Sequence, residues 1–200
     1  MRIGIYGGSF NPIHCGHIAL ARQLVDKGYV EEVWLMVSPQ NPLKTGQKLL
    51  PDATRLALAT KALKGEAHVK ASDFEFALPR PSYTWNTLEA LSTVYPQHQF
   101  SLIIGADNWQ LFNEWKHPER ILGHYPILVY PRRGYNINPS SLPQGATLVD
   151  MPLYDVSSTL IRTRVAQGKS ISGLVPPCIV SDATQACLAL LHNGTDRQKL

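Results

Sequence analysis

The sequence predicts an α/β protein built on a single doubly wound parallel sheet. Short β-branched and apolar runs alternate along the chain with longer stretches of helical periodicity, which is typical of successive βαβ units. The chain has 200 residues, 44% of them hydrophobic, which is enough for one core and too few for two large domains. We therefore expect one domain over residues 1–194 and a disordered tail over 195–200.

Residues 1–73 contain three predicted strands and two predicted helices. A strand over Arg2–Tyr6 ends at Gly7 and Gly8, because paired glycines let the backbone turn sharply. A helix begins near Gly16, has apolar residues at helical spacing, and ends at Gly28, a typical C-terminal cap. The elements that follow by the same criteria are a strand over 32–37, a helix from Asp52 to Gly65 and a strand over 68–73.

The rest of the chain continues this alternation of strands and helices. The run 99–105 is a strongly apolar strand. Either Ser157 or Ser158 caps a helix that ends near Gly168, because serine is a preferred N-cap residue. Residues 131–145 are rich in Pro, Asn, Ser and Gly and predict a surface loop. The other predicted elements are a helix over 84–95, strands over 127–130 and 147–151, and a helix over 181–193.

Composition excludes several classes of protein. The net charge is only +4 and the basic residues are scattered, so no nucleic-acid partner is expected. No segment approaches the roughly 18 consecutive apolar residues of a membrane span, and the opening residues lack the features of a signal peptide. The three cysteines show no CxxC spacing, which argues against a disulfide framework or a structural zinc site. We expect a cytoplasmic protein with no membrane partner, and the composition is compatible with a homo-oligomer.

The turn after the first strand is the strongest candidate for chemistry. Residues 7–17 read GGSFNPIHCGH. His14 and His17 are three residues apart at the start of a helix, so their rings share one face of its first turn. The free N–H groups and the dipole of that helix end favour an anion, and imidazoles can donate hydrogen bonds to phosphate oxygens. This pattern predicts a phosphate site.

Three alternatives fit this turn less well. Two histidines could merely cap a helix, but the adjoining pair of glycines argues against a purely structural role. A dinucleotide-binding turn of an oxidoreductase requires GxGxxG and a ribose-binding carboxylate, whereas the second strand ends with Val37, Ser38 and Pro39. A metal site could use His14, Cys15 and His17. However, Cys15 should point away from both rings and no fourth ligand is evident.

Residues 7–17 resemble the first signature, HxGH, of the nucleotidyltransferase superfamily, and the GGSFNP form is most similar to the bacterial nicotinate mononucleotide adenylyltransferases. Residues 156–162, VSSTLIR, resemble the second signature, ISSTxxR. Further blocks resemble the family at 39–44, 82–84 and 105–107, followed by Trp115. The resemblance covers residues 1–168 and implies a Rossmann-like nucleotidyltransferase fold. It also implies an enzyme of NAD biosynthesis that transfers an adenylyl group from ATP to nicotinate mononucleotide, giving nicotinate adenine dinucleotide and pyrophosphate.

The resemblance also implies roles on the ATP side. The catalytic residues it implies are His14, His17 and Arg162. The ATP-binding residues it implies are Gly7, Gly8, Ser9, Phe10, Lys44, Gly105, Asp107, Ser157 and Ser158. Asp107 is in addition the predicted N-cap of a short helix over 108–115. A Mg²⁺ ion is implied, and because the sequence shows no carboxylate cage we expect ATP phosphates and water to hold it.

On the mononucleotide side, the family resemblance implies contacts from Ser82, Tyr83, Thr84, Trp115 and Arg132. The first three begin a helix, whose N–H groups and threonine hydroxyl could receive the nicotinate carboxylate. Trp115 resembles the tryptophan that stacks on the pyridine ring, and Arg132 is the candidate contact for the mononucleotide phosphate. We assign the other tryptophans and one arginine to structural positions, with packing expected for Trp34, Trp85 and Trp109 and a surface charge for Arg55.

Other functions remain open at this point. A phosphopantetheine or nicotinamide mononucleotide adenylyltransferase shares the superfamily signatures. The GGSFNP turn, together with residues 82–84 and Trp115, argues against the pantetheine enzyme. A nucleotide-binding sensor without catalysis has no need to retain His14, His17, Ser158 and Arg162 together.

Overall fold

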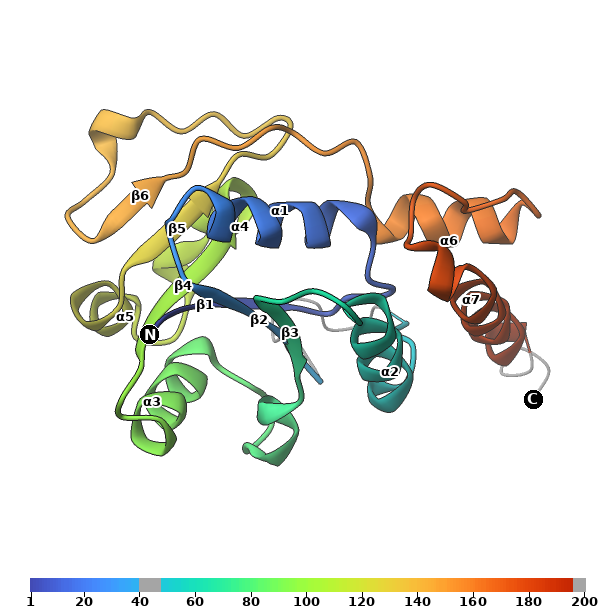
Figure 1. Ribbon diagram of the computed structural model, residues 1–200, viewed down its shortest axis with the longest axis horizontal. Coiled ribbons are helices and arrows are strands. Elements are labelled where there is room, and N and C mark those ends of the chain that lie inside the picture. The colour runs from blue at the N-terminus through green and yellow to red at the C-terminus, as the bar shows by residue number, and fades with distance from the viewer. Residues whose placement is uncertain (40–47, 196–200) are drawn as a thin grey trace.

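The computed structural model describes residues 1–39 and 48–195. Within these ranges, six parallel strands form one sheet in the order β3-β2-β1-β4-β5-β6 (Figure 1). The strands are β1 (Arg2–Gly8), β2 (Glu32–Val37), β3 (Val69–Ser72), β4 (Gln99–Gly105), β5 (Ile127–Tyr130) and β6 (Ala146–Leu148). The predicted doubly wound α/β fold is confirmed. The strand order reverses between β1 and β4, where such sheets bind ligands at the carboxyl ends of their strands.

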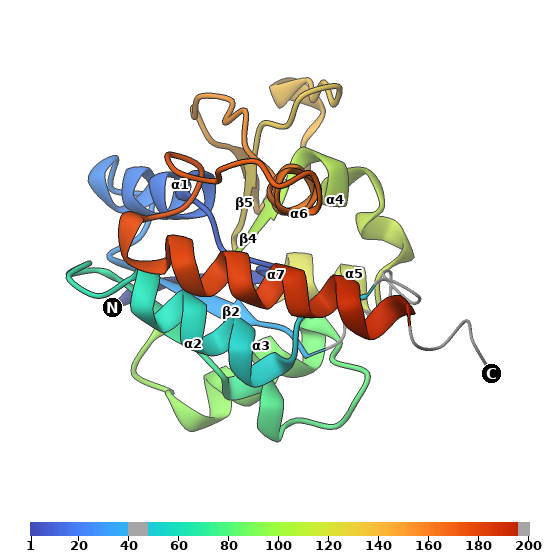
Figure 2. The ribbon, with the colours of Figure 1, turned by 90° about the vertical axis from the view of Figure 1, so that its right-hand side faces the viewer.

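Helices pack on both faces of the sheet. One face is covered by α1 (Cys15–Asp26), α2 (Asp52–Ala62), α6 (Ser158–Ala166) and α7 (Val180–Thr195). The other face is covered by α3 (Thr84–Val94) and α5 (Pro118–His124), and Figure 1 shows α1 and α3 on opposite sides of the strands. Figure 2 shows α7 lying across α2 and beside α6. Apolar side chains of the strands therefore alternate between two cores.

Short helical segments complete the described chain. They are η2 (Phe74–Ala77), α4 (Ala106–Gln110), η3 (Phe112–Glu114), η4 (Pro139–Ser141) and η5 (Pro177–Ile179). The short helix predicted over 108–115 with Asp107 as its cap is wrong. Gly105 has the extended backbone of the N-cap, so Asp107 lies inside the first turn of α4, and the chain then tightens into η3. The seven-residue helix α5 was not predicted, because it is too short to show a helical period.

Other boundaries differ by a few residues from the predicted ones. The second helix begins after Pro51, which is its N-cap, and ends at Ala62 rather than Gly65. The last strand spans 146–148 rather than 147–151, and its ladder closes with a hydrogen bond from the Val149 amide to the Val129 carbonyl. Helix α7 ends at Thr195, the first residue of the predicted tail, and the remainder of that tail lies outside the described residues. No helix in the described ranges is both long and apolar enough to cross a bilayer.

Arg55 is the clearest correction to the sequence-based assignment. We predicted a surface charge, but its side chain is fully buried on the inner face of α2. Its guanidinium donates hydrogen bonds to acceptors from three segments of chain, which are the carbonyls of Ser9, Ser38, Pro39 and Leu50 and the carboxylate of Asp52. The planar fork of arginine has five N–H donors, so it can satisfy all of these groups at once. Arg55 thereby fastens the ends of β1 and β2 to α2.

Replacing Arg55 by methionine should lower the free energy of unfolding by about 3–5 kcal/mol, because several backbone carbonyls at this buried position would lose their donor. Urea unfolding followed by circular dichroism measures this change. The matched control is Arg133→Met, which removes an ion pair with Asp155 that is exposed on both sides and should cost less than about 1 kcal/mol. Equal losses for the two variants would contradict the role assigned to Arg55.

Candidate active site

Two cavities adjoin at the carboxyl end of the sheet. The first is lined by the ends of β1 and β4, the start of α3 and the segment around Trp115. The second, of about 650 Å³, is lined by the start of α1, the start of α6 and the loop that follows β5, and its volume suits a nucleotide-sized ligand. Both linings include Tyr6 and Tyr130. The site predicted after the first and fourth strands therefore coincides with these two cavities.

His14 and His17 cap α1 reciprocally. The Nδ1 atom of His14 accepts from the His17 amide at 3.4 Å, and the Nδ1 atom of His17 accepts from the His14 amide at 3.3 Å. The two rings stack with centroids 3.5 Å apart, and both line the second cavity. Because each Nδ1 is an acceptor, each neutral ring carries its proton on Nε2. The pair can therefore present two N–H donors to an anion.

Burial sets the charge of His14. Its side chain is only 4% exposed, and this burial, together with the charge of Arg132, lowers the pKa of His14 from 6.5 to about 3. His14 is therefore neutral at pH 7 and acts as a hydrogen-bond donor rather than a cation. The alternative metal site gains no support, because no group of three or more His, Cys, Asp or Glu side chains in residues 1–39 and 48–195 is arranged to hold a metal ion.

The second signature is hydrogen-bonded to the first. The Ser158 hydroxyl donates to the Pro12 carbonyl at 2.8 Å, and the Arg162 guanidinium donates to the Asn11 carbonyl at 2.8 Å. Ser157 caps α6 by accepting from the Leu160 amide, and it lines the second cavity. The structure thus brings His14, His17 and Ser157 to one cavity, whereas the Ser158 hydroxyl and the Arg162 guanidinium are engaged with backbone carbonyls beside it.

Gly16 allows the two signatures to approach this closely. A Cβ atom at this position would lie 2.8 Å from a methyl group of Val156 and 3.2 Å from Nδ1 of His14. Any side chain here would push the segment before α6 away from α1. The glycine between the two histidines is therefore required by packing.

Asp107 and Arg132 lie together on the opposite wall of the second cavity. The Arg132 Nε atom is 3.4 Å from an Asp107 carboxylate oxygen, and the Arg132 guanidinium lies 5.6 Å from the centre of the Tyr130 ring. A Cβ at Gly105 would collide with the Asp107 carboxylate and approach Cγ of Arg132 to 3.1 Å, so a side chain at this position would displace the pair. Arg132, which was predicted to contact the mononucleotide phosphate, lines the second cavity with the histidines, whereas Trp115 lines the first.

The other residues predicted to bind ATP are placed differently. Gly7 and Gly8 line the first cavity rather than the second. Phe10 is 2% exposed and packs its ring over Gly8 and against the edge of His17, while the Ser9 carbonyl accepts from Arg55. Neither Ser9 nor Phe10 is among the residues that line these two cavities. Lys44 lies outside the described residues.

The predicted mononucleotide residues other than Arg132 share the first cavity. Ser82, Tyr83, Thr84 and Trp115 all line it, and α3 begins at Thr84 as predicted. Ser82 Oγ, Trp115 Nε1 and Glu75 Oε2 are buried and have no hydrogen-bond partner within the described part of the chain. These three polar atoms line one cavity and can form hydrogen bonds there with water or with a polar ligand. Trp34 and Trp85 are buried packing residues as expected, and Trp109 is half-buried against Phe112.

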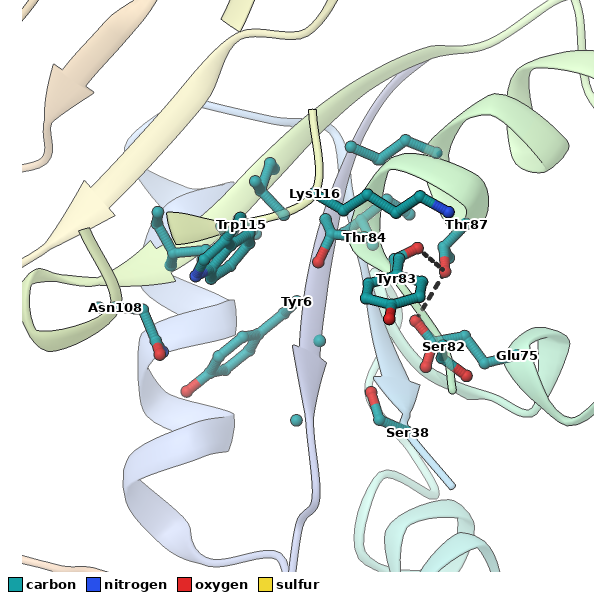
Figure 3. A pocket seen from close by; sticks show the side chains of 18 of the residues that line it. Tyr6, Ser38, Glu75, Ser82, Tyr83, Thr84, Thr87, Asn108, Trp115 and Lys116 are labelled. Atoms are coloured by element: carbon teal, nitrogen blue, oxygen red, sulfur yellow. Dashed lines mark hydrogen bonds between the residues drawn. The ribbon is translucent and has the colours of Figure 1, made fainter. Parts of the chain in front are cut away.

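Sequence reasoning missed several lining residues. Glu75 accepts from the Thr87 hydroxyl at 2.9 Å, and Figure 3 shows these two grouped with Ser82, apart from Trp115. Burial raises the pKa of the Glu75 carboxyl. Other polar residues of this lining that the sequence reasoning missed are Ser38 directly after β2, Asn108 and Lys116 directly after predicted residues, Tyr6 near the end of β1, and Tyr130 at the end of β5. The rule that ligands lie beyond the carboxyl ends of parallel strands could have identified Tyr6 and Tyr130.

A family model described as cytidylyltransferase-like matches residues 5–164. The chain belongs to this nucleotidyltransferase family, and the predicted resemblance is confirmed.

Proteins similar to this chain carry names that specify one activity within the family. A Bacteroides fragilis protein named "probable nicotinate-nucleotide adenylyltransferase" is 47% identical over 178 residues, which is 89% of each chain. A Porphyromonas gingivalis protein of the same name is 41% identical over 194 residues, covering 94% of this chain and 98% of the relative. A Plasmodium falciparum nicotinic acid mononucleotide adenylyltransferase, solved in complex with NaAD, has the same fold with a TM-score of 0.73. It is 18% identical and covers 94% of this chain and 95% of its own.

The buried His14 should make stability fall in acid. Between pH 6.5 and about 3, the unfolded chain protonates His14 while the folded chain does not, so protonation favours unfolding as the pH falls. His14→Asn keeps a capping side chain and removes the titrating ring. The difference in free energy of unfolding between wild type and variant should therefore change by about 1 kcal/mol per pH unit from pH 6 to 4. Urea unfolding at several pH values measures it, and a difference that does not vary with pH would contradict the buried neutral state.

Proposed function

We propose that this chain transfers the adenylyl group of ATP to nicotinate mononucleotide, giving nicotinate adenine dinucleotide and pyrophosphate for NAD biosynthesis. The proposal is supported by relatives at 41% and 47% identity that carry this name. The structural observation that carries it is the pair of adjoining cavities. The second cavity has anion-binding donors, and the first is lined by the start of α3 and by the indole of Trp115. Such an arrangement can hold two nucleotides with their phosphates facing each other.

On the ATP side, the chain offers donors rather than nucleophiles. The Nε2–H groups of His14 and His17, the free amides at the start of α6, and the guanidinium groups of Arg162 and Arg132 would hold the triphosphate. An oxygen of the mononucleotide phosphate attacks the α-phosphorus and forms a P–O bond. The bond from the α-phosphorus to the oxygen bridging the α- and β-phosphates breaks, and pyrophosphate leaves with that oxygen. The protein contributes alignment and neutralisation of charge, which is the main requirement of this class of reaction.

On the mononucleotide side, the start of α3 would receive the nicotinate carboxylate. The Ser82 hydroxyl is unpaired, the first amides of α3 lie at a helix N-terminus, and Lys116 brings a cation to the same cavity, 4.6 Å from the centre of the Tyr83 ring. Trp115 supplies the aromatic surface for the pyridine. An amide in place of the carboxylate would lose the charge that these groups favour.

We propose that Mg²⁺ accompanies ATP and is held mainly by phosphates and water. In the described ranges, the carboxylates that line the second cavity are those of Asp107 and Asp155, and each is paired with an arginine. Histidines with Nδ1 engaged and protons on Nε2 are donors, not ligands. This donor set fits an ion that arrives on the triphosphate and neutralises its charge.

The cytoplasmic location and the homo-oligomer stay predictions.

The first experiment is to measure pyrophosphate release with ATP and Mg²⁺, using nicotinate mononucleotide, nicotinamide mononucleotide and phosphopantetheine as acceptors. We expect the highest kcat/KM for nicotinate mononucleotide by at least about ten-fold, which corresponds to one lost charged hydrogen bond. A preference for another acceptor would overturn the substrate assignment and keep the ATP site. ATP binding without turnover of any acceptor would instead favour a nucleotide sensor.

Trp115→Ala should raise KM for the mononucleotide about ten-fold or more and change KM for ATP by less than two-fold, because a stacked aromatic ring contributes about 1–3 kcal/mol. Steady-state kinetics with each substrate varied in turn measures both constants. The control is Trp109→Ala, which removes an indole that packs on Phe112 and lines neither cavity. Equal effects on the two KM values would show that Trp115 is not the pyridine platform.

A further inference from the structure

A pair of tyrosine hydroxyls marks the boundary between the two cavities. Tyr6 on β1 and Tyr130 on β5 are separated in the sheet by β4, and their hydroxyl oxygens lie 3.2 Å apart. Both side chains are buried, at 6% and 8% exposure. Among the described residues, these two are the ones that line both cavities. The pair therefore sits where a ligand must pass from one cavity to the other.

One of the two hydroxyl protons of this pair is not engaged in the hydrogen bond between them. Each phenol carries one proton, and the hydrogen bond between them consumes one of the two. In residues 1–39 and 48–195, neither hydroxyl makes a second hydrogen bond. Burial raises the pKa of both phenols, so both keep their protons at neutral pH. Both side chains line the cavities, so the second proton is available to an acceptor that enters them, either water or an oxygen of a ligand.

The surroundings of the pair favour an anionic acceptor. The Arg132 guanidinium lies over the Tyr130 ring, and the His17 ring lies 5.9 Å from the Tyr6 ring in an edge contact. Asp107, the nearby carboxylate, is paired with Arg132. Figure 3 shows the Tyr6 hydroxyl pointing away from the group formed by Glu75 and Ser82 in the first cavity. The second proton is therefore directed to the boundary, not to the polar end of the first cavity.

We propose that the Tyr6–Tyr130 pair donates its second proton to a non-bridging phosphate oxygen of the dinucleotide that spans both cavities. The inference rests on the proposed function, in which the two nucleotides become joined through their phosphates. A molecule occupying both cavities must place its pyrophosphate at their boundary, where the pair lies. The hydroxyl pair thus supplies a donor to the bridging phosphates in addition to those of the two signatures.

The test compares ligands that differ in phosphate. Isothermal titration calorimetry measures the affinity of the wild type, Tyr6→Phe and Tyr130→Phe for nicotinate adenine dinucleotide and for adenosine. One of the two variants removes the hydroxyl that donates to the charged oxygen. We expect that variant to bind the dinucleotide about ten-fold more weakly than the wild type, and both variants to bind adenosine within two-fold of the wild type. The matched control is Tyr125→Phe, which removes a hydroxyl bonded to Ser92 at 3.0 Å and lines neither cavity.

The outcomes separate this inference from the proposed function. Dinucleotide affinity within two-fold of wild type for both variants, or an equal loss for adenosine, overturns the inference. If the wild type turns over nicotinate mononucleotide at the same time, the proposed function stands without it. A wild type that binds the dinucleotide but lacks turnover, with affinity lost in a variant, overturns the proposed function and leaves the inference standing. A wild type that does neither overturns both.

Discussion

The guanidinium of Arg55 holds together the backbone from which the candidate site is built. It reaches carbonyls after β1 and after β2 and is paired with Asp52 at the start of its own helix. These loops run at the carboxyl ends of neighbouring strands, where the backbone leaves the sheet and its carbonyls lose their ladder partners. A buried arginine satisfies them without water. The loop before α1 is thereby fixed on one side before any ligand is considered.

The other side of that loop is fixed from α6, a segment almost 150 residues further along the chain. Ser158 and Arg162 hold the carbonyls of Pro12 and Asn11, and Gly16 lets the two segments approach. Residues 9–14 are thus held between α2 and α6. The two histidines at the end of this loop cap each other, which sets their tautomers. The structure explains why the two short signatures accompany each other. The second signature holds the loop that carries the two histidines and adds the donors at the start of α6.

The division into two cavities explains how one sheet can serve two nucleotides. The reversal of strand order between β1 and β4 opens the space above the sheet, and α3 and α1 contribute their N-terminal ends to different cavities. Helix starts favour anions, so each cavity has its own preference for negative charge. Aromatic residues divide the tasks further. Trp115 offers a flat surface in the first cavity, whereas Tyr6 and Tyr130 offer hydroxyls at the boundary.

The sequence by itself determined the sheet and the position of the site along it. Strands β2, β4 and β5 lie where their apolar runs predicted them, because burial of a parallel strand is a local property of composition. The HxGH turn and the start of α3 were also found, since glycines, histidines and helix starts act within a few residues. The tertiary structure alone decided which partner each polar side chain has. In the structure, Arg55 is buried and the Ser158 hydroxyl donates to the Pro12 carbonyl. Arg132 lines the same cavity as the histidines, and the hydroxyls of Tyr6 and Tyr130 are hydrogen-bonded. These outcomes depend on segments distant in sequence, and a hydrogen bond between such segments leaves no periodic pattern in either of them.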